Sequence, residues 1–529
     1  MAAVLLLAVC APPGAALTGE TGVDRFGGCL AAHKSGQILL MIDESGSLKE
    51  TDPQDNRVTA AKYLAQQLTQ FSADSGIALE VALAGFSEDY RQVLGWTKLD
   101  AANLPVVESS IDGFKDRDAG QDTDYWAALD GARSTLAQSP KPAEGQRCQA
   151  LAWFTDGKLD FNQRDASKPY APEQNLNSAA GIAATIKAAQ DSICRDRGLA
   201  DQLRSSDIVT FGIGLAPKPE QGADFDLLKA IVTGEPTGAV SSCGAIRSPI
   251  PGDFYLAQNI DDLLFAFDKF STPGQPPIEI SSGACARQIC EEAKHRFVLD
   301  RSVRSVSVLG AADRAGLTPY LVAPDGASAA LNAGPAAIDL GGVKIDYVPE
   351  GEKSVSIRMS NSQAPQWQGV WALVFVDPVG DATAKTRSSI HISGDLYPAW
   401  PDAAKTTLHS KDDNVAVTLA VVDGRKVPVD PATLLGQASL SAVLVDVKGR
   451  RHTRVGRALL PEWAGRGVKV KGDAGVLVRP IARAPRVARD RVIHGHSQGR
   501  PGQADGARRD RRRLHHAQRE RHGARRRER

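Results

Sequence analysis

Five oxygen-bearing side chains stand where the sequence predicts the end of a strand or the start of a helix. They are Asp43, Ser45, Ser47, Thr123 and Asp156. Asp43 ends the apolar run 37–43, with Ser45 and Ser47 just after it, and Asp156 ends the apolar run 149–156. Carboxylate and hydroxyl oxygens are the ligands that Mg²⁺, Mn²⁺ and Ca²⁺ prefer. The sequence therefore predicts a divalent-cation site for Mg²⁺, or for Mn²⁺ or Ca²⁺ in its place, built from three separate loops.

Alternating strands and helices between residues 36 and 272 must bring these side chains together. We expect strands at 37–43, 78–86, 149–156, 208–215 and 253–258. We expect helices at 57–73, 100–112, 124–138, 176–203, 223–233 and 260–270. Continuous apolar runs are typical of parallel strands buried on both faces. The pattern predicts an α/β fold with a doubly wound, mainly parallel sheet, helices on both faces and ligand-binding loops at the carboxyl ends of the strands.

Three strings around the candidate ligands carry a family resemblance. ILLMIDESGS, DTDYWAALDGA and LAWFTDG resemble the von Willebrand factor A domain, whose metal-ion-dependent adhesion site reads DxSxS, then Thr, then Asp. The resemblance covers about residues 30–272. It implies that the three hydroxyls bind the metal directly and that the two carboxylates lie close by, often acting through water. It also implies that the metal faces an acidic residue of a protein partner, which the loops 50–57 and 158–175 would select.

Enzyme chemistry finds little support, and we expect the protein not to be an enzyme. His33 is the one histidine within residues 30–272, and it precedes the first predicted strand. A Ser–His–acid triad with Ser45 or Ser47 is therefore not expected, and no HExxH motif occurs. Two other functions stay open. One is a metal-dependent hydrolase with Glu44 or Asp124 as its general base, and the other is a cell-envelope scaffold with an idle metal site.

Nearby residues have simpler interpretations. Taken singly, each candidate ligand is a plausible turn or helix cap, and the five together favour a metal. Trp126 and Trp153 are expected in the core. The loop before the helix at 124–138 holds an acidic cluster, for which a second cation site is an alternative to the solvated loop that we favour. The cluster consists of Asp116, Asp118, Asp122 and Asp124.

The first residues and the cysteines indicate export from the cytoplasm. Residues 1–16 resemble a secretory signal peptide, with a short apolar core and small residues at the cleavage site, although a positive n-region is missing. Six cysteines remain after its removal, and an even number fits disulfides in an exported protein. We expect a secreted or cell-surface protein of bacterial type. Our preferred pair is Cys148–Cys194, and a small loop closed by Cys285–Cys290 would then leave Cys29–Cys243. Six cysteines allow 15 pairings, so the sequence leaves the connectivity open.

The pattern changes after the α/β region at 30–272. We expect a linker at 273–296, an immunoglobulin-like β-sandwich at 297–396 and a second, incomplete β domain at 397–478, because short strands and turns replace helices. The tail at 479–529 has no Phe, Trp or Tyr, and we expect it to be disordered. It is either a polybasic arm or, as we favour, an out-of-frame product that replaces a natural segment such as a membrane anchor.

The charges separate the body of the chain from its tail. The 529 residues carry a formal net charge of +1, but residues 481–529 alone hold 16 arginines, no lysine and five acidic residues. The body is therefore acidic, which argues against nucleic acid as its partner. We expect a protein partner that offers a carboxylate to the metal, with the protein at the cell surface or associated with a membrane.

Overall fold

The computed structural model describes residues 21–399, apart from short gaps, and a few short strands outside this range. The gaps are 141–147, 239, 274–276, 333, 351–352, 362–363, 382 and 395–396, and the outer strands lie at 5–7, 415–417, 420–422, 439–445, 451–459, 468–470, 475–476 and 478–479. The predicted signal peptide, except residues 5–7, and the predicted tail, except residue 479, lie outside the described residues. Predictions on those two segments stay predictions.

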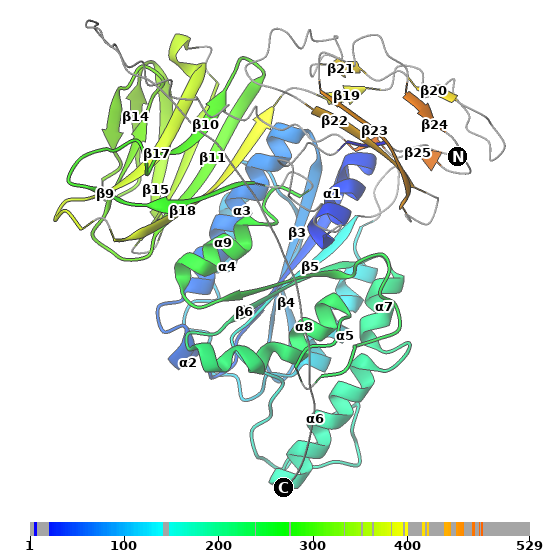
Figure 1. The fold of residues 1–529 in the computed structure, drawn as a ribbon. Coiled ribbons are helices and arrows are strands. Elements are labelled where there is room, and N and C mark those ends of the chain that lie inside the picture. Colours follow the sequence, from blue (N-terminus) through cyan, green and yellow to red (C-terminus); the bar gives the residue numbers. More distant parts are fainter. Residues whose placement is uncertain are drawn as a thin grey trace, which may run out of the picture. The chain divides into compact units, whose positions relative to one another are not determined.

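A six-stranded sheet forms the centre of the first region (Figure 1). Its order is β4-β3-β2-β5-β6-β7, with β2 (Ser35–Asp43), β3 (Ala78–Phe86), β4 (Tyr90–Lys98), β5 (Gln149–Thr155), β6 (Val209–Leu215) and β7 (Gly252–Ala257). Neighbouring strands are parallel except β3 and β4, which are antiparallel. The five predicted strands are confirmed, and the sheet is mixed because β4 adds an antiparallel edge.

Helices cover both faces of this sheet, as the sequence predicts. One buried cluster joins the sheet to α1 (Gly22–His33), α3 (Asn56–Ser75), α4 (Leu104–Asp112) and α9 (Ile260–Asp268). The other cluster joins it to α5 (Tyr125–Ala137), α6 (Ala179–Cys194), α7 (Leu199–Ser205) and α8 (Asp226–Thr233). Along β2, Ile38, Leu40 and Ile42 belong to the first cluster, whereas Leu39 and Met41 belong to the second. Strand alternation therefore explains why the whole run is apolar.

One predicted helix is two helices. Residues 176–203 form α6 and α7, and the break between them contains Arg197 with a φ of 61°. A left-handed backbone conformation at a non-glycine residue cannot continue a right-handed helix. The prediction of a single helix is therefore wrong at this point.

Three disulfides are present among the described residues: Cys29–Cys148, Cys194–Cys243 and Cys285–Cys290. The predicted pair Cys285–Cys290 is confirmed, and the predicted pairs Cys148–Cys194 and Cys29–Cys243 are wrong. Cys29 lies on α1, which packs near the start of the sheet and brings it to the residue before β5. Cys194 meets the loop before β7 instead, where Gly244 N donates to Cys194 O at 2.8 Å.

Two further sheets follow the α/β domain. The antiparallel one has the order β14-β15-β16-β11-β18-β8, and the other has the order β10-β17-β12-β13 with β9 beside β17. Their bounds are β8 (Ile278–Gly283), β9 (Cys285–Ala286), β10 (His295–Leu299), β11 (Val303–Ala312), β12 (Thr318–Val322), β13 (Ser328–Ala330), β14 (Ala336–Leu340), β15 (Val343–Glu350), β16 (Ser354–Ser360), β17 (Gly369–Asp377) and β18 (Lys385–Gly394). One buried cluster takes residues from both sheets. Later antiparallel sheets are therefore present, an immunoglobulin-like topology stays a prediction, and β8 lies within the range predicted as a linker.

Buried polar contacts join the α/β domain to the antiparallel sheet. Asp268 at the end of α9 accepts hydrogen bonds from Tyr63 Oη and Ser389 Oγ, each at 2.5 Å, and lies 2.7 Å from His391 Nε2. All four side chains are more than nine-tenths buried. Burial alone would raise the pKa of Asp268, but His391 and the hydrogen bonds bring this pKa below its ordinary value. The carboxylate is therefore held ionised inside the protein.

Beyond residue 399 the described residues form short strands. They are β20 (Val415–Val417), β21 (Ala420–Val422), β22 (Ser439–Val445), β23 (Arg451–Leu459), β24 (Val468–Val470), β25 (Gly475–Val476) and β26 (Val478–Arg479). Strand β22 pairs with β23, and β1 (Leu5–Leu7) pairs with β22 and β26. Much of the β domain predicted at 397–478 lies outside the described residues. None of the helices in the described residues has the length and apolar character needed to cross a membrane.

Candidate metal centre

The ends of β2 and β5 place two carboxylates at the same edge of the sheet. Parallel pairing sets Ile42 opposite Phe154, so Asp43 and Thr155 follow side by side. Thr155 Oγ1 donates to Asp43 Oδ2 at 2.5 Å, and Ser45 N donates to Asp43 Oδ1 at 2.7 Å. Asp43 is fully buried, and both of its oxygens are fixed by hydrogen bonds. The next residue along β5, Asp156, is also buried.

Two serine hydroxyls and the Asp156 carboxylate form a small triangle of oxygens. Ser45 Oγ lies 3.1 Å from Ser47 Oγ, and Asp156 Oδ1 lies 3.4 Å from Ser45 Oγ and 3.0 Å from Ser47 Oγ. In an octahedral Mg²⁺ complex with bonds of about 2.1 Å, adjacent oxygens are about 3.0 Å apart. The three oxygens therefore have the spacing and the chemistry of one face of a magnesium coordination shell.

Thr123 reaches the same place from another loop. Its Oγ1 and Ser47 Oγ lie 3.7 and 3.5 Å from the point where a Cβ on Gly157 would stand. Backbone bonds tie this loop to the serine loop, since Gly46 N donates to Gly120 O at 2.9 Å. A Cβ on Gly120 would lie 2.8 Å from Glu44 O in the serine loop and 1.9 Å from Ser87 Oγ after β3, so the close approach of the chain requires glycine there. The structure thus brings all five predicted residues to one edge, and their role as metal ligands stays a prediction.

Two threonines belong to the site although the sequence reasoning does not name them. Thr155 holds Asp43, and Thr51 Oγ1 in α2 (Leu48–Thr51) donates to the second oxygen of Asp156. Thr155 could have been found from its position at the end of the predicted strand. Thr51 lies four residues after Ser47, a spacing that puts two side chains on one face of a helix, but so short a helix has no signal of its own.

The two carboxylates are electrostatically uncompensated. Burial and the nearby Asp156 carboxylate raise the pKa of Asp43 to about 7, and burial raises the pKa of Asp156. Neither carboxylate forms an ion pair with any described residue. The described residues also contain no group of three or more His, Cys, Asp or Glu side chains that could hold a metal. A metal here would therefore rest on hydroxyls as much as on carboxylates.

Two of the four residues in the acidic cluster before α5 are buried and paired with basic side chains. Asp122 and Asp124 are buried, and Lys168 Nζ lies 2.9 and 3.0 Å from their Oδ2 atoms. Arg164 Nη2 also lies 2.5 Å from Asp122 Oδ2. The expectation of a solvated loop is therefore wrong for these two residues, because basic side chains from a distant loop compensate them. Asp116 is exposed, as expected.

The predicted core tryptophans differ in environment. Trp153 is fully buried between Phe86 and Tyr125, with ring centroids 6.1 and 4.7 Å away. Trp126 is half-buried and lies against Tyr170, with ring centroids 4.6 Å apart. The first is a core residue, as predicted, and the second packs the loop 158–175 onto α5.

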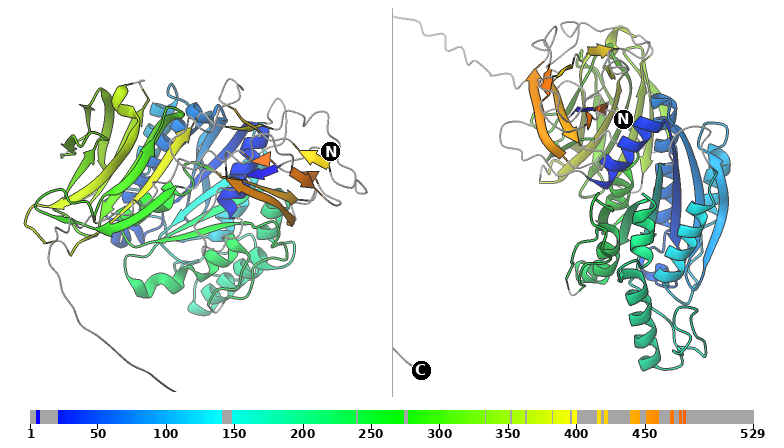
Figure 2. Two further views of the ribbon diagram at one scale, coloured as in Figure 1. Left: turned by 45° about the horizontal axis from the view of Figure 1, so that its top comes forward. Right: turned by 90° about the vertical axis from the view of Figure 1, so that its right-hand side faces the viewer.

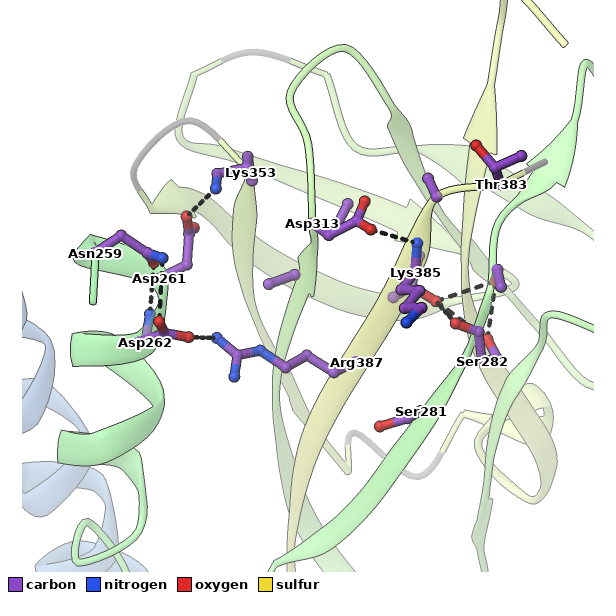
Figure 3. A pocket seen from close by; sticks show the side chains of 15 residues that line it. Asn259, Asp261, Asp262, Ser281, Ser282, Asp313, Lys353, Thr383, Lys385 and Arg387 are labelled. Carbon is purple, nitrogen blue, oxygen red and sulfur yellow. Dashed lines mark hydrogen bonds and ion pairs between the residues drawn. The ribbon is translucent and has the colours of Figure 1, made fainter. Parts of the chain in front are cut away.

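A separate cavity of about 670 Å³ lies between the start of α9 and the antiparallel sheet (Figure 3). Asp261 and Asp262 line it from the helix, and Lys353 and Arg387 line it from the sheet. Lys353 Nζ lies 3.4 Å from Asp261 Oδ2, and Arg387 Nη2 lies 2.5 Å from Asp262 Oδ1. These charges compensate one another, and none of the five predicted ligands lines the cavity. It is therefore distinct from the candidate metal centre.

The fold and the oxygen-rich edge define the class of the first domain. It is an α/β domain like the von Willebrand factor A domain, and residues 38–158 match the family model described as von Willebrand factor type A domain. The match contains Asp43, Ser45, Ser47, Thr123 and Asp156. No curated protein sequence matches this chain.

Several solved structures are similar to the chain at low identity. A von Willebrand factor type A protein from Catenulispora acidiphila is 12% identical, with a TM-score of 0.28, and the match covers 80% of this chain and 66% of that one. A pilus adhesin from Lactobacillus rhamnosus GG is 11% identical, with a TM-score of 0.32, covering 83% and 52%. Proximal thread matrix protein 1 from the mussel byssus, solved with a zinc-occupied metal-ion-dependent adhesion site, is 14% identical, with a TM-score of 0.29, covering 48% and 50%. Each match spans less than two thirds of the other chain. Because these TM-scores are low, we base the class of the domain on the family model and on the site residues.

Proposed function

We propose that this protein binds a divalent cation at Asp43, Ser45, Ser47, Thr123 and Asp156 and uses it to hold an acidic residue of a protein partner. The observation that carries the proposal is the pair of buried carboxylates, which have hydroxyl donors but no ion pair among the described residues. A divalent cation supplies the missing positive charge. Mg²⁺ suits these hard oxygens, keeps water readily and leaves a coordination position for a carboxylate from outside.

The site supports binding better than hydrolysis. A metal-dependent hydrolase needs a general base that faces the metal-bound water. The two acids considered for that role are engaged elsewhere, because Glu44 Oε1 lies 2.7 Å from Arg91 and 3.0 Å from Arg117. Asp124 caps α5 and pairs with Lys168. We therefore propose a binding protein and not an enzyme.

We place this function outside the cytoplasm. Disulfides persist in oxidising compartments, and three of them occur in the described residues. Export through residues 1–16 and a location at the cell surface complete the proposal. The antiparallel sheets that follow the α/β domain would then act as spacers between this domain and the surface.

Calorimetric titration with Mg²⁺ and Mn²⁺ tests the metal site. Asp43→Asn and Asp156→Asn are expected to abolish metal binding, because each removes one of the two uncompensated charges. Asp191→Asn is the matched control, since Asp191 is exposed on α6 and pairs with Lys187 at the surface. Unchanged metal affinity in both site variants would contradict the proposal.

A displayed peptide library tests the partner chemistry. Peptides retained by the Mn²⁺-loaded protein and released by a chelator are expected to share an Asp or Glu residue. Replacing that residue with Asn or Gln is expected to abolish binding. Metal-dependent binders without any acidic residue would contradict the proposed bridge from the metal to a carboxylate.

A further inference from the structure

The segment between β5 and α6 returns to the loop that carries Thr123. Figure 1 and the right-hand view of Figure 2 show α6 projecting beyond the other helices together with neighbouring loops. Thr123 N donates to Asp160 O at 2.9 Å, and Asp160 N donates to Thr123 O at 3.4 Å. Two loops that are far apart in the sequence therefore form an antiparallel bridge at a predicted metal ligand.

Lys168 lies between the two carboxylates that flank Thr123. Its ammonium is 2.9 Å from Asp122 Oδ2 and 3.0 Å from Asp124 Oδ2, and it donates to Glu88 O at 2.9 Å. A lysine ammonium has three N–H donors, and all three are used here. Lys168 is only 7% exposed. The contacts hold the chain on both sides of Thr123 and leave no donor for solvent.

Arg164 holds the first of these carboxylates with a fixed orientation. Its Nη1 donates to Asp122 Oδ1 at 2.6 Å, and its Nη2 donates to Asp122 Oδ2 at 2.5 Å. Asn162 N adds a bond to Oδ1 at 3.1 Å. A bidentate arginine–carboxylate pair fixes direction as well as distance. Burial would raise the pKa of Asp122, but Arg164 and Lys168 lower it below its ordinary value.

Tyr170 completes the contact on the other flank. Its hydroxyl donates to Asp124 Oδ2 at 3.0 Å, and its ring lies against Trp126. Asp124 Oδ1 meanwhile accepts from two backbone amides at the start of α5. The two oxygens of the Asp124 carboxylate therefore have different roles. Oδ1 caps the N-terminus of α5, and Oδ2 binds Tyr170 and Lys168 of the distant loop.

We propose that Arg164 and Lys168 are positioning residues for the metal site, which hold the Thr123 hydroxyl in place through Asp122 and Asp124. Successive side chains of an extended chain point in opposite directions. Residues that grip both neighbours of Thr123 therefore fix it without covering its hydroxyl. The inference rests on the proposed function, because it gives Thr123 a metal to bind. The affinity for metal then depends on a loop that contributes no ligand.

The size of the effect follows from the geometry that Mg²⁺ demands. This ion tolerates little departure from octahedral bonds of about 2.1 Å. Loss of residues that orient the ligands of a metal lowers metal affinity by about 10- to 100-fold. The coupling between metal binding and loop position is reciprocal. If the ordered loop raises the affinity for metal, bound metal must stabilise the ordered loop by the same factor.

Mn²⁺ titration calorimetry on the full chain tests the proposal. Lys168→Met is expected to weaken Mn²⁺ binding by about 10-fold or more. Arg164→Gln is expected to weaken it by a smaller factor, because the ion pair between Asp122 and Lys168 remains. Lys187→Met is the matched control, since Lys187 pairs with Asp191 on the exposed face of α6. If Lys168→Met does not fold, Arg164→Gln carries the test. Affinities equal to that of the control would overturn the proposal.

A double-mutant cycle separates positioning of Thr123 from any other effect of the loop. Lys168→Met is expected to change Mn²⁺ affinity in the native background and to have little effect when Thr123 is already alanine. An equal loss in both backgrounds would overturn the role assigned to Lys168. If Thr123→Ala itself leaves Mn²⁺ affinity unchanged, the proposed function fails at that ligand, which is a different result.

Trypsin supplies a second readout, because it cleaves after Arg164, whereas the bond after Lys168 is protected by Pro169. Saturating Mn²⁺ is expected to slow cleavage at the Arg164–Asp165 bond by about 10-fold or more, because metal binding and loop position are coupled. The protection is expected to disappear in Thr123→Ala. Cleavage that is equally fast with and without Mn²⁺, in a protein that binds Mn²⁺, would overturn the coupling.

Discussion

Asp43→Asn is expected to stabilise the metal-free protein while removing its response to metal. Burial and Asp156 raise the pKa of Asp43 from 3.8 to about 7. A group with a raised folded-state pKa contributes stability that is present below its unfolded pKa and is lost as the pH rises through about 7. At pH 8 without metal, ionised Asp43 therefore costs the folded protein about 4 kcal/mol.

The surrounding hydrogen bonds allow an amide at this position. Ser45 N can still donate to the remaining oxygen. Thr155 Oγ1 loses a carboxylate acceptor, but it has Gly157 O as a second acceptor at 3.2 Å. Weaker hydrogen bonds to the neutral side chain cost about 1–2 kcal/mol. The net gain is then about 2 kcal/mol, which raises the melting temperature by about 4–8 °C for a domain of this size.

Scanning calorimetry at pH 8, with chelator or with excess Mg²⁺, measures both effects. The wild-type protein is expected to gain about 2.7 kcal/mol at a Mg²⁺ concentration of about 100 times Kd. Asp43→Asn is expected to melt higher than wild type in chelator and to gain nothing from Mg²⁺. Asp191→Asn serves as the control and should behave like wild type. An Asp43→Asn protein that is less stable in chelator, or that still responds to Mg²⁺, would refute the reasoning.

Three other outcomes follow from the described contacts. Thr51→Val frees one oxygen of Asp156 and is expected to weaken Mg²⁺ binding by about 10-fold in calorimetric titration. His295 is fully buried and its pKa is lowered to about 4, so stability is expected to fall by about 2 kcal/mol as urea unfolding is moved from pH 7 to pH 4.5. The sign follows because the unfolded chain binds the proton before the folded one does. Replacing Cys29 and Cys148 with alanine opens a crosslink that spans 119 residues and is expected to cost about 5 kcal/mol in urea unfolding.

Each of these outcomes has a clear contrary result. Thr51→Val with native Mg²⁺ affinity would show that the second oxygen of Asp156 needs no fixing. A His295→Gln protein that loses as much stability at pH 4.5 as wild type would assign the pH effect to other groups. A double cysteine variant as stable as the native protein would show that the unfolded chain is already constrained.

The strands of the α/β domain follow closely from the sequence, and the exceptions have physical reasons. Central parallel strands bury both faces, so a continuous apolar run such as 37–43 can be recognised as a strand from the sequence. Strand β4 (Tyr90–Lys98) lies at the edge of the sheet and has no buried residue, so it lacks the continuous apolar run that reveals the other strands. Helix α1 begins with the capping box of Thr21 and Asp24, which is a readable signal, and it contributes Phe26 and Leu30 to the core.

The predicted ligands were accessible to sequence reasoning because each follows a predicted strand or opens a predicted helix. The residues that hold these ligands in position, such as Arg164 and Lys168, could not be found from the sequence. Arg164 lies 42 residues from Asp122 in an irregular loop, and no periodicity links the two. The disulfide pairing failed for the same reason, because it depends on where α1 lies in space and not on the spacing of cysteines.

The disulfides have a further consequence for how this domain can change. Cys29–Cys148 and Cys194–Cys243 fasten the end of the sheet where its strands begin. Among the described residues, the opposite end has ion pairs and hydrogen bonds but no disulfide. Covalent reinforcement and the candidate metal centre thus lie at different ends of one scaffold. Substitutions in the loops around the candidate centre can accumulate over generations without disturbing a cysteine, and under the proposed function the domain could thereby acquire new partners.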